Sequence, residues 1–344
     1  MSTAPASTRM FREAAQAPDV VREQLQANAA PIEQLAVLLR AHPPRAVVTC
    51  ARGSSDHAAT FARYLIETRL GLLTSSAAPS VSSVYAAAPD LKGTVMLAIS
   101  QSGASPDLLA AVSSGRAAGA RIVALVNAQT SPLAQLADDL IPLRAGVEES
   151  VAATKSYIAS LAAIVQLVAR WAEDEELATA LSEAPELLAR AWELDWSAAV
   201  KHLTKAQSLY VVGRGLGLAI AQEAALKFKE TCRLHAEAVS AAELRHGPLA
   251  LVRAGFPLLL FTQDDESRAG IVELASELGA AGADVLIAGA HAPRATLLPS
   301  ERAHAVIEPI LFIQSFYRMV NALALARGAN PDHPPHLKKV TETL

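Results

Sequence analysis

The chain has 344 residues, a length typical of two domains, and 51% of them are hydrophobic, which is ample for a buried core. It has 30 lysines and arginines and 34 acidic residues, so the formal net charge is −4, and no basic stretch stands out. This charge balance gives no support for nucleic-acid binding.

The first half alternates short apolar runs with helix-forming segments. The N-terminus has no apolar signal-peptide core, and the most apolar predicted helix, 157–171, is too short to span a bilayer. We therefore expect a cytoplasmic protein with no membrane partner. The predicted helices span 9–28 (interrupted at Pro18), 32–40, 58–68, 108–118 and 157–171, and the predicted strands span 45–50, 94–100, 121–127 and 139–143.

The second half repeats this alternation after a charged run, 173–176, which we interpret as a solvated link rather than a metal site. Arg52-Gly53 and Arg214-Gly215 each follow a strand and open a helix. The predicted helices span 177–190, 196–205, 218–230 and 312–327, and the predicted strands span 208–212, 256–262, 284–289 and 305–307.

Alternating strands and helices imply parallel sheets with right-handed crossovers, and hence two doubly wound α/β domains. Ligands of such domains bind at the carboxyl ends of the strands. The predicted segments are an N-terminal helical segment 1–30, a first domain 31–172, linker helices 173–200, a second domain 201–328 and a C-terminal tail 329–344.

The two cysteines, Cys50 and Cys232, each lie in an apolar or helical context. Two such cysteines do not make a disulfide framework, and the chain shows no metal-ligand spacing. We expect both to be buried thiols of a cytosolic protein, and we expect neither a metal nor an organic cofactor.

The strand at 94–100 ends in small polar side chains directly before a helix: Ser100, Gln101, Ser102 and Ser105. Hydroxyl donors and backbone N–H groups at a helix N-terminus bind phosphate without needing a lysine. Ser54 and Ser55 follow the strand at 45–50 in the same way, although an N-cap serine in a plain turn is the structural alternative there. The corresponding second-half run, 262–266, carries carboxylates that would repel a phosphate, so one phosphate site per chain is expected.

The helix predicted at 218–230 carries charged residues on one face. Glu223, Lys227 and Glu230 lie at i, i+4 and i+7. An ordinary exposed ion pair is the structural alternative. The polar residues that follow, from His235 to His246, lie in a region otherwise made of Ala, Val and Leu, and this favours a functional cluster.

Three runs from this region carry a family resemblance: A-L-K-F-K-E at 225–230, H-A-E-A at 235–238 and A-E-L-R-H-G-P-L-A-L at 242–251. They resemble the isomerase half of glucosamine-6-phosphate synthases and, more broadly, proteins built from sugar isomerase (SIS) domains. The resemblance implies two tandem SIS domains, each a flavodoxin-like, doubly wound parallel sheet flanked by helices. It also implies that Ser100, Gln101, Ser102, Ser105, Ser54 and Ser55 bind the phosphate of a sugar phosphate.

Two further segments extend the resemblance. The segment 148–157, which contains Val151, is similar to the family's V-A-S-T-K sugar-contacting loop, with Ala153 in place of serine; a plain helix start is the alternative. The tail from 330 is similar to P-R-x-L-x-K followed by V-T, with Pro335 in place of arginine. Matching its proline and leucine makes Lys339 the active-site lysine, whereas matching V-T makes it Lys338.

The resemblance assigns roles to Glu230, His246 and Lys339. Glu230 transfers a proton between C1 and C2. Lys227 lies one turn from Glu230 on the same helix, so its charge can stabilise the developing enediol oxygen. His246 is the acid–base for ring opening and comes from the neighbouring subunit, which implies a homodimer. Lys339 stabilises the carbonyl oxygen or forms a Schiff base.

The synthase takes ammonia from a glutamine-hydrolysing domain that this sequence does not include. We therefore expect the reverse direction, in which glucosamine 6-phosphate is opened and isomerised and water releases fructose 6-phosphate and ammonia. A deglycase or deaminase for another phosphorylated amino sugar or fructosamine, and synthase-direction chemistry, remain alternatives. A non-catalytic sugar-phosphate sensor is the other alternative, although it would not need the acid–base set.

Overall fold

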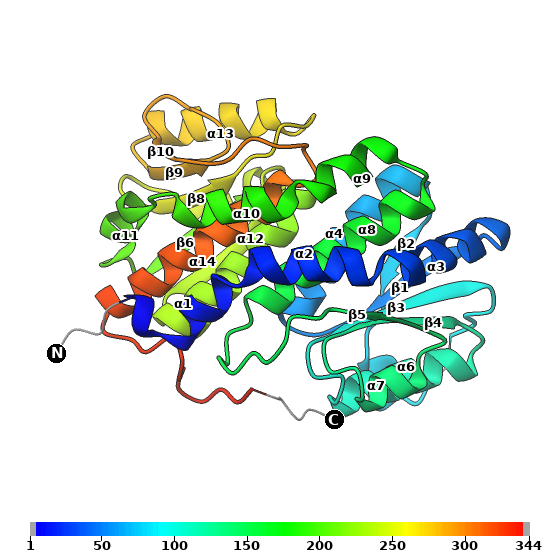
Figure 1. The fold of residues 1–344 in the computed structure, drawn as a ribbon. Coiled ribbons are helices and arrows are strands. Elements are labelled where there is room, and N and C mark those ends of the chain that lie inside the picture. Colours follow the sequence, from blue (N-terminus) through cyan, green and yellow to red (C-terminus); the bar gives the residue numbers. More distant parts are fainter. Residues whose placement is uncertain (1–4, 88, 340–344) are drawn as a thin grey trace. The chain divides into compact units, whose positions relative to one another are not determined.

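The computed structural model describes residues 5–87 and 89–339, and it contains two parallel five-stranded sheets (Figure 1). The strand order is β2-β1-β3-β4-β5 in the first sheet and β10-β9-β8-β6-β7 in the second. In both, the chain reverses its direction of travel across the sheet after the first two strands, which is the flavodoxin-like order. The α/β class and the parallel sheets are as predicted.

The described residues form two compact units. The first-sheet unit comprises 19–148, 156–182 and 338–339, and the second-sheet unit comprises 5–18, 149–155 and 183–337. Each unit thus includes segments from distant parts of the chain. This grouping does not test the five consecutive segments predicted from the sequence, and they stay a prediction.

The first sheet is buried on both faces, since every residue of β3 is buried. Figure 1 shows α6 and α7 on one face and α4 with α8 on the other. The strands are β1 Ala46–Cys50, β2 Thr74–Ser76, β3 Thr94–Ser100, β4 Arg121–Val126 and β5 Asp139–Pro142. The helices are α2 Ala17–Ala27, α3 Ala29–Ala41, α4 Ser54–Leu70, α5 Ser80–Ser83, α6 Pro106–Ala117, α7 Pro132–Leu136, α8 Lys155–Trp171 and α9 Glu175–Ser182.

The second sheet has α13 on one face and α12 with α14 on the other (Figure 1). The strands are β6 Ser208–Gly213, β7 His235–Ser240, β8 Pro257–Phe261, β9 Asp284–Ala288 and β10 Thr296–Leu298. The helices are α1 Arg9–Ala14, α10 Ala184–Glu193, α11 Ser197–Leu203, α12 Leu216–Cys232, α13 Arg268–Ala280 and α14 Glu308–Ala326, with short 3₁₀ turns η1 Pro5–Ser7, η2 Glu243–Arg245 and η3 Pro248–Leu251.

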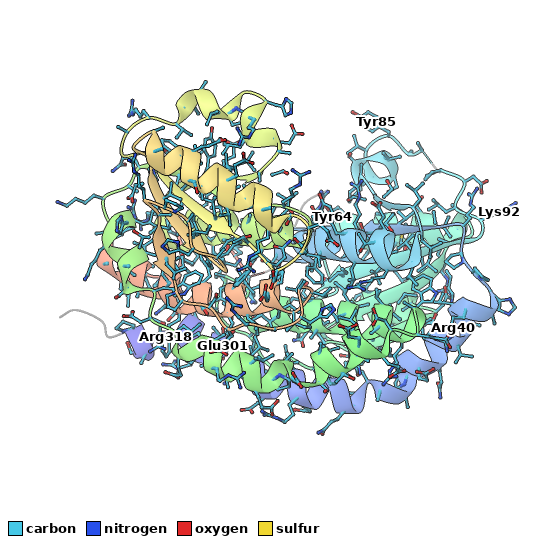
Figure 2. All side chains as sticks on the ribbon, turned by 90° about the horizontal axis from the view of Figure 1, so that it is seen from above. Arg40, Tyr64, Tyr85, Lys92, Glu301 and Arg318 are labelled. Atoms are coloured by element: carbon cyan, nitrogen blue, oxygen red, sulfur yellow. The ribbon has the colours of Figure 1, made fainter. Side chains whose placement is uncertain are left out.

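Helix α14 is the central helix of its unit. Within the described residues it is the one helix long and apolar enough to cross a membrane, with a mean hydropathy of 1.2, but 78% of that window is buried in protein. Phe316 packs edge-on against Phe228 of α12, with ring centroids 5.0 Å apart. Arg318, labelled in Figure 2, donates to the Trp192 carbonyl of α10 at 2.6 Å. These contacts are those of a core helix.

Several predicted elements differ from the structure. The strand predicted at 305–307 is wrong, because these residues form a turn and Val306 and Ile307 are buried at the start of α14. The edge strands β2, β7 and β10 were not predicted. The helix predicted at 177–190 is divided into α9 and α10. The helix predicted at 9–28 is divided into α1, which ends at Ala14, and α2, which begins at Ala17, so the break comes before Pro18. Pro18 lies in the first turn of α2, where its missing N–H is not needed.

Both cysteines are buried free thiols, as predicted. Burial raises the pKa of Cys50 and of Cys232 to about 12. With a pKa of about 12, only about one thiol in 10⁴ is ionised at pH 8, and the thiolate is the form that reacts.

We expect Ellman's reagent to label neither cysteine in the native protein at pH 8 and to label both after denaturation. Rapid labelling of the native protein would contradict the burial of these side chains.

Candidate functional site

The loop after β3 folds tightly around the N-terminus of α6. Ser100 Oγ accepts a hydrogen bond from the Gly103 amide at 2.9 Å, and Ser102 Oγ accepts one from the Ala104 amide at 3.4 Å. Gly103 has φ 62°, and a Cβ there would lie 2.2 Å from Ser131 Oγ, so only glycine fits. Gln101, Ser102 and Ser105 are half-buried beside this turn.

The second group of predicted phosphate ligands lies at the same sheet edge. Strands β1 and β3 are neighbours, with Cys50 opposite Ala98, so the turns that follow them leave the sheet side by side. Ser54 and Ser55 are the first two residues of α4, which begins four residues earlier than predicted. All six predicted ligands therefore gather where the strand order reverses, which is the usual ligand position in such sheets.

One residue at this edge was not predicted. Arg52 follows β1, and its Nε and Nη2 atoms lie 2.8 and 2.7 Å from Oδ2 of Asp107, in the first turn of α6. The Asp107 side chain is 2% exposed, whereas that of Arg52 is 53% exposed. The repeated Arg-Gly pair in the sequence was the available signal, but it does not reveal the partner 55 residues away.

The corresponding loop of the second sheet is occupied by a carboxylate of the chain itself. Asp265 accepts hydrogen bonds from the Ser267 amide at 2.9 Å and from Gln263 Nε2 at 2.7 Å. Asp264 pairs with Arg268 at 2.9 Å. This arrangement supports the expectation of a single phosphate site in the first half, because these carboxylates would repel an anion that bound to the second-sheet loop.

Helix α12 carries a buried network of charges. Lys227 Nζ lies 2.6 Å from Glu230 Oε2 and 3.2 Å from Glu223 Oε1, and Tyr317 Oη of α14 donates to Glu223 Oε1 at 3.0 Å. The side chains of Glu223 and Lys227 are 0% and 1% exposed, and that of Glu230 is 18% exposed. The alternative of an ordinary exposed ion pair is therefore wrong.

The charge state of this network follows from its geometry. Burial by itself lowers the pKa of Lys227, but the carboxylates of Glu223 and Glu230 raise it, and the net effect is a rise. Lys227 therefore remains an ammonium ion that holds one oxygen of Glu230. The other oxygen, Oε1, makes no hydrogen bond to any residue in 5–87 or 89–339.

The residues after α12 are less crowded than the sequence suggested. In β7, His235 and Glu237 are exposed while Ala236 between them is buried, so these two polar side chains form the solvated face of an edge strand. His246 is exposed at the end of η2. No hydrogen bond or ion pair joins its imidazole to another residue that the structure describes. Its role across a subunit interface stays a prediction.

The structure distinguishes the two tail lysines. Lys339 Nζ lies 3.3 Å from Oε2 of Glu148, a buried carboxylate that also accepts hydrogen bonds from the Ser156 amide and hydroxyl at 3.2 and 2.6 Å. Lys338 is exposed. The Val340-Thr341 match lies outside the described residues. Which of the two lysines acts in the active site stays a prediction.

The loop containing Val151 is anchored by the N-terminal helix. Glu13 of α1 accepts hydrogen bonds from the Glu149 amide at 2.5 Å and from the Ser150 amide at 3.1 Å. Lys155 begins α8 and donates to Gln16 Oε1 at 2.7 Å, which agrees with the helix-start alternative for this residue. Val151 itself is half-buried, and its contact with a sugar stays a prediction.

The comparisons with known proteins agree with these features. The SIS domain model matches residues 42–170 and 202–296, which is more than half of the chain. The chain belongs to the SIS domain family. A relative from Aeropyrum pernix, glutamine–fructose-6-phosphate aminotransferase (isomerizing), is 34% identical over 308 residues, which cover 83% of this chain and 49% of that protein. The chain thus spans about half the length of this curated relative.

Two solved structures are similar to this chain in fold. A proposed phosphosugar isomerase from Silicibacter pomeroyi is 44% identical, with a TM-score of 0.91 over 94% of this chain and 100% of that one. The C-terminal domain of glucosamine-fructose-6-phosphate aminotransferase from Francisella tularensis has a TM-score of 0.85 over 95% and 98% of the two chains. At 24% identity, the second likeness shows the fold alone.

The buried network predicts a large and specific loss of stability. Lys227→Ala leaves the carboxylate of Glu223 buried without its ammonium partner, so we expect a loss of about 3–5 kcal/mol in the free energy of unfolding. Lys229→Ala, two residues along the same helix at an exposed position, is the control and should change it by less than about 0.5 kcal/mol. Urea denaturation measures both. Equal effects of the two substitutions would contradict the buried network.

Proposed function

We propose that this chain is an amino-sugar-phosphate isomerase and deaminase that converts glucosamine 6-phosphate to fructose 6-phosphate and ammonia. Membership of the SIS domain family supports the proposal, as does a relative at 34% identity whose name includes fructose 6-phosphate and isomerisation. The 44% identity to a proposed phosphosugar isomerase agrees with it. The observation that supports the proposal most directly is the buried network of α12. In it, the ammonium ion of Lys227 holds one partly exposed carboxylate, that of Glu230.

The proton transfer is assigned to Glu230. In the open-chain aldose, this carboxylate removes the proton from C2 and returns it to C1, which needs one base that serves both carbons. Lys227 fixes Oε2 at 2.6 Å, which leaves Oε1 for the substrate. The same ammonium ion stabilises negative charge that develops on the C1 oxygen during the transfer.

The remaining residues serve the steps around this transfer. Ser54, Ser55 and the loop from Ser100 to Ser105 bind the phosphate, and His246 opens the sugar ring. After the transfer C1 is an alcohol and C2 an imine; water adds at C2 and ammonia leaves, which gives fructose 6-phosphate. Lys339, with a half-buried ammonium group on Glu148, is assigned to the carbonyl oxygen of the substrate.

The first test is the release of ammonia and fructose 6-phosphate from glucosamine 6-phosphate. Glu230→Gln keeps the size of the side chain but removes the base, so we expect turnover to fall by about 10²- to 10⁴-fold. Glu237→Gln on the exposed face of β7 is the control and should retain wild-type turnover. Binding of the sugar phosphate to the wild type without any release would contradict the proposed reaction and favour a sensor.

The second test concerns subunits, because we also propose a cytoplasmic homodimer in which His246 acts in the partner's site. His246→Ala and Glu230→Gln should each be inactive alone. In a mixed population, half of the dimers are heterodimers in which one of two sites is intact, so about a quarter of wild-type activity should return. If unfolding and reassembly of the mixture restores none, His246 does not act across a subunit interface.

A further inference from the structure

Arg52 lies at the edge of the first sheet where the loop from Ser100 to Ser105, here called the serine loop, begins. The roles assigned above do not use Arg52. Cys50, the last residue of β1, is opposite Ala98 in the β1–β3 pairing; Arg52 follows β1 by two residues, and Ser100 is the last residue of β3. Neighbouring strands are about 4.8 Å apart. The strand order reverses between β1 and β3, which places Arg52 at the ligand-binding position of this sheet.

The Arg52 side chain extends towards the helix that the serine loop precedes. Its Nε and Nη2 atoms both contact Oδ2 of Asp107, the second residue of α6. The other oxygen of Asp107 accepts a hydrogen bond from the Leu108 amide at 2.8 Å. Asp107 is thus a buried anchor that holds the guanidinium beside the N-terminus of α6.

The contacts of this guanidinium leave part of it available. Its Nη1 atom makes no hydrogen bond to any residue in 5–87 or 89–339, and the side chain is 53% exposed. A guanidinium carries five N–H donors in one plane, and two of its nitrogens are used here on a single oxygen. The remaining edge suits a tetrahedral oxyanion, which a planar fork of donors binds through two oxygens.

The charges at this edge of the sheet also favour an anion beside Arg52. The serine loop offers hydroxyls and amides but no cation, while the Asp107 carboxylate at the start of α6 would by itself disfavour a second anion nearby. Arg52 neutralises this carboxylate and adds donors at the same place. A dianionic phosphate ester gains more from this cation than a neutral sugar does.

We propose that Arg52, held in position by Asp107, is a phosphate-binding residue of this chain and that it selects phosphorylated over unphosphorylated sugars. The proposal rests on the proposed function, since it concerns the same phosphate site. It assigns to the site a positive charge that the serine loop alone does not provide.

The test is the Kd of inorganic phosphate, measured by calorimetry on the full chain. Arg52→Gln should weaken binding by at least about tenfold, because a charge-assisted hydrogen bond is lost, and it should reduce the dependence of Kd on ionic strength. Arg116→Gln is the control. Like Arg52, Arg116 pairs with an aspartate, Asp138 at 3.1 Å, but it lies in the last turn of α6, and its replacement should leave Kd unchanged.

A double variant separates phosphate binding from a structural role. In Arg52→Gln/Asp107→Asn no buried carboxylate is left unpaired, so this variant also carries the test if Arg52→Gln does not fold. Phosphate binding that stays weak supports the proposal, whereas binding restored to the wild-type Kd would show that Arg52 only neutralises Asp107 and would overturn it.

The failures of the two proposals are distinguishable. Wild-type binding with an unchanged Kd in Arg52→Gln would overturn the role of Arg52 and leave the proposed reaction intact. A wild type that binds no phosphate would overturn both the role of Arg52 and the phosphate anchor of the proposed function. The release of ammonia from glucosamine 6-phosphate is measured independently of either outcome.

Discussion

The buried ammonium ion of Lys227 constrains the second-sheet unit. An unpaired charge in this position would be very unfavourable, so α12 supplies two carboxylates, one turn before and one turn after it. Glu223 in turn needs the hydroxyl of Tyr317, which fixes α14 against α12. These contacts set the rotation of α12 about its axis. As a result Glu230 is the one carboxylate of the network with an exposed portion, which is the property that a general base requires.

The two sheets have the same strand order but differ at their carboxyl edges. In the first, the loop that begins at Ser100 carries serine hydroxyls and amides before the start of α6, next to a guanidinium on a buried aspartate. In the second, Asp265 takes the corresponding position and receives the hydrogen bonds of its own loop. One topology thus provides an edge suited to an anion and an edge already filled by one. This difference supports the assignment of phosphate binding to the first sheet and of acid–base chemistry to α12.

The sequence predicts best those elements whose pattern is local. The strand at 94–100 has the predicted bounds because its apolar run is continuous. The strands β1, β4, β5, β6 and β9 differ from their predicted ranges by one residue at one end, and β8 differs by one residue at each end. The edge strands β2, β7 and β10 are short or half-polar, so their pattern resembles a loop. The i, i+4 spacing of Glu223 and Lys227 is the same in an exposed pair and a buried one. Their burial depends on Tyr317, 94 residues away, and the link from Arg52 to Asp107 likewise exists only in the folded chain.

The central claim is that Glu230 moves a proton between neighbouring carbons of a phosphorylated amino sugar. Its most direct measurement is deuterium incorporation, by NMR in D₂O, into sugar phosphate incubated with the protein. We predict deuterium at the carbon to which the proton is returned, with no incorporation by Glu230→Gln although that variant still binds the sugar phosphate. Incorporation at the wild-type rate in Glu230→Gln, or none in the wild type with the sugar phosphate bound, would contradict it.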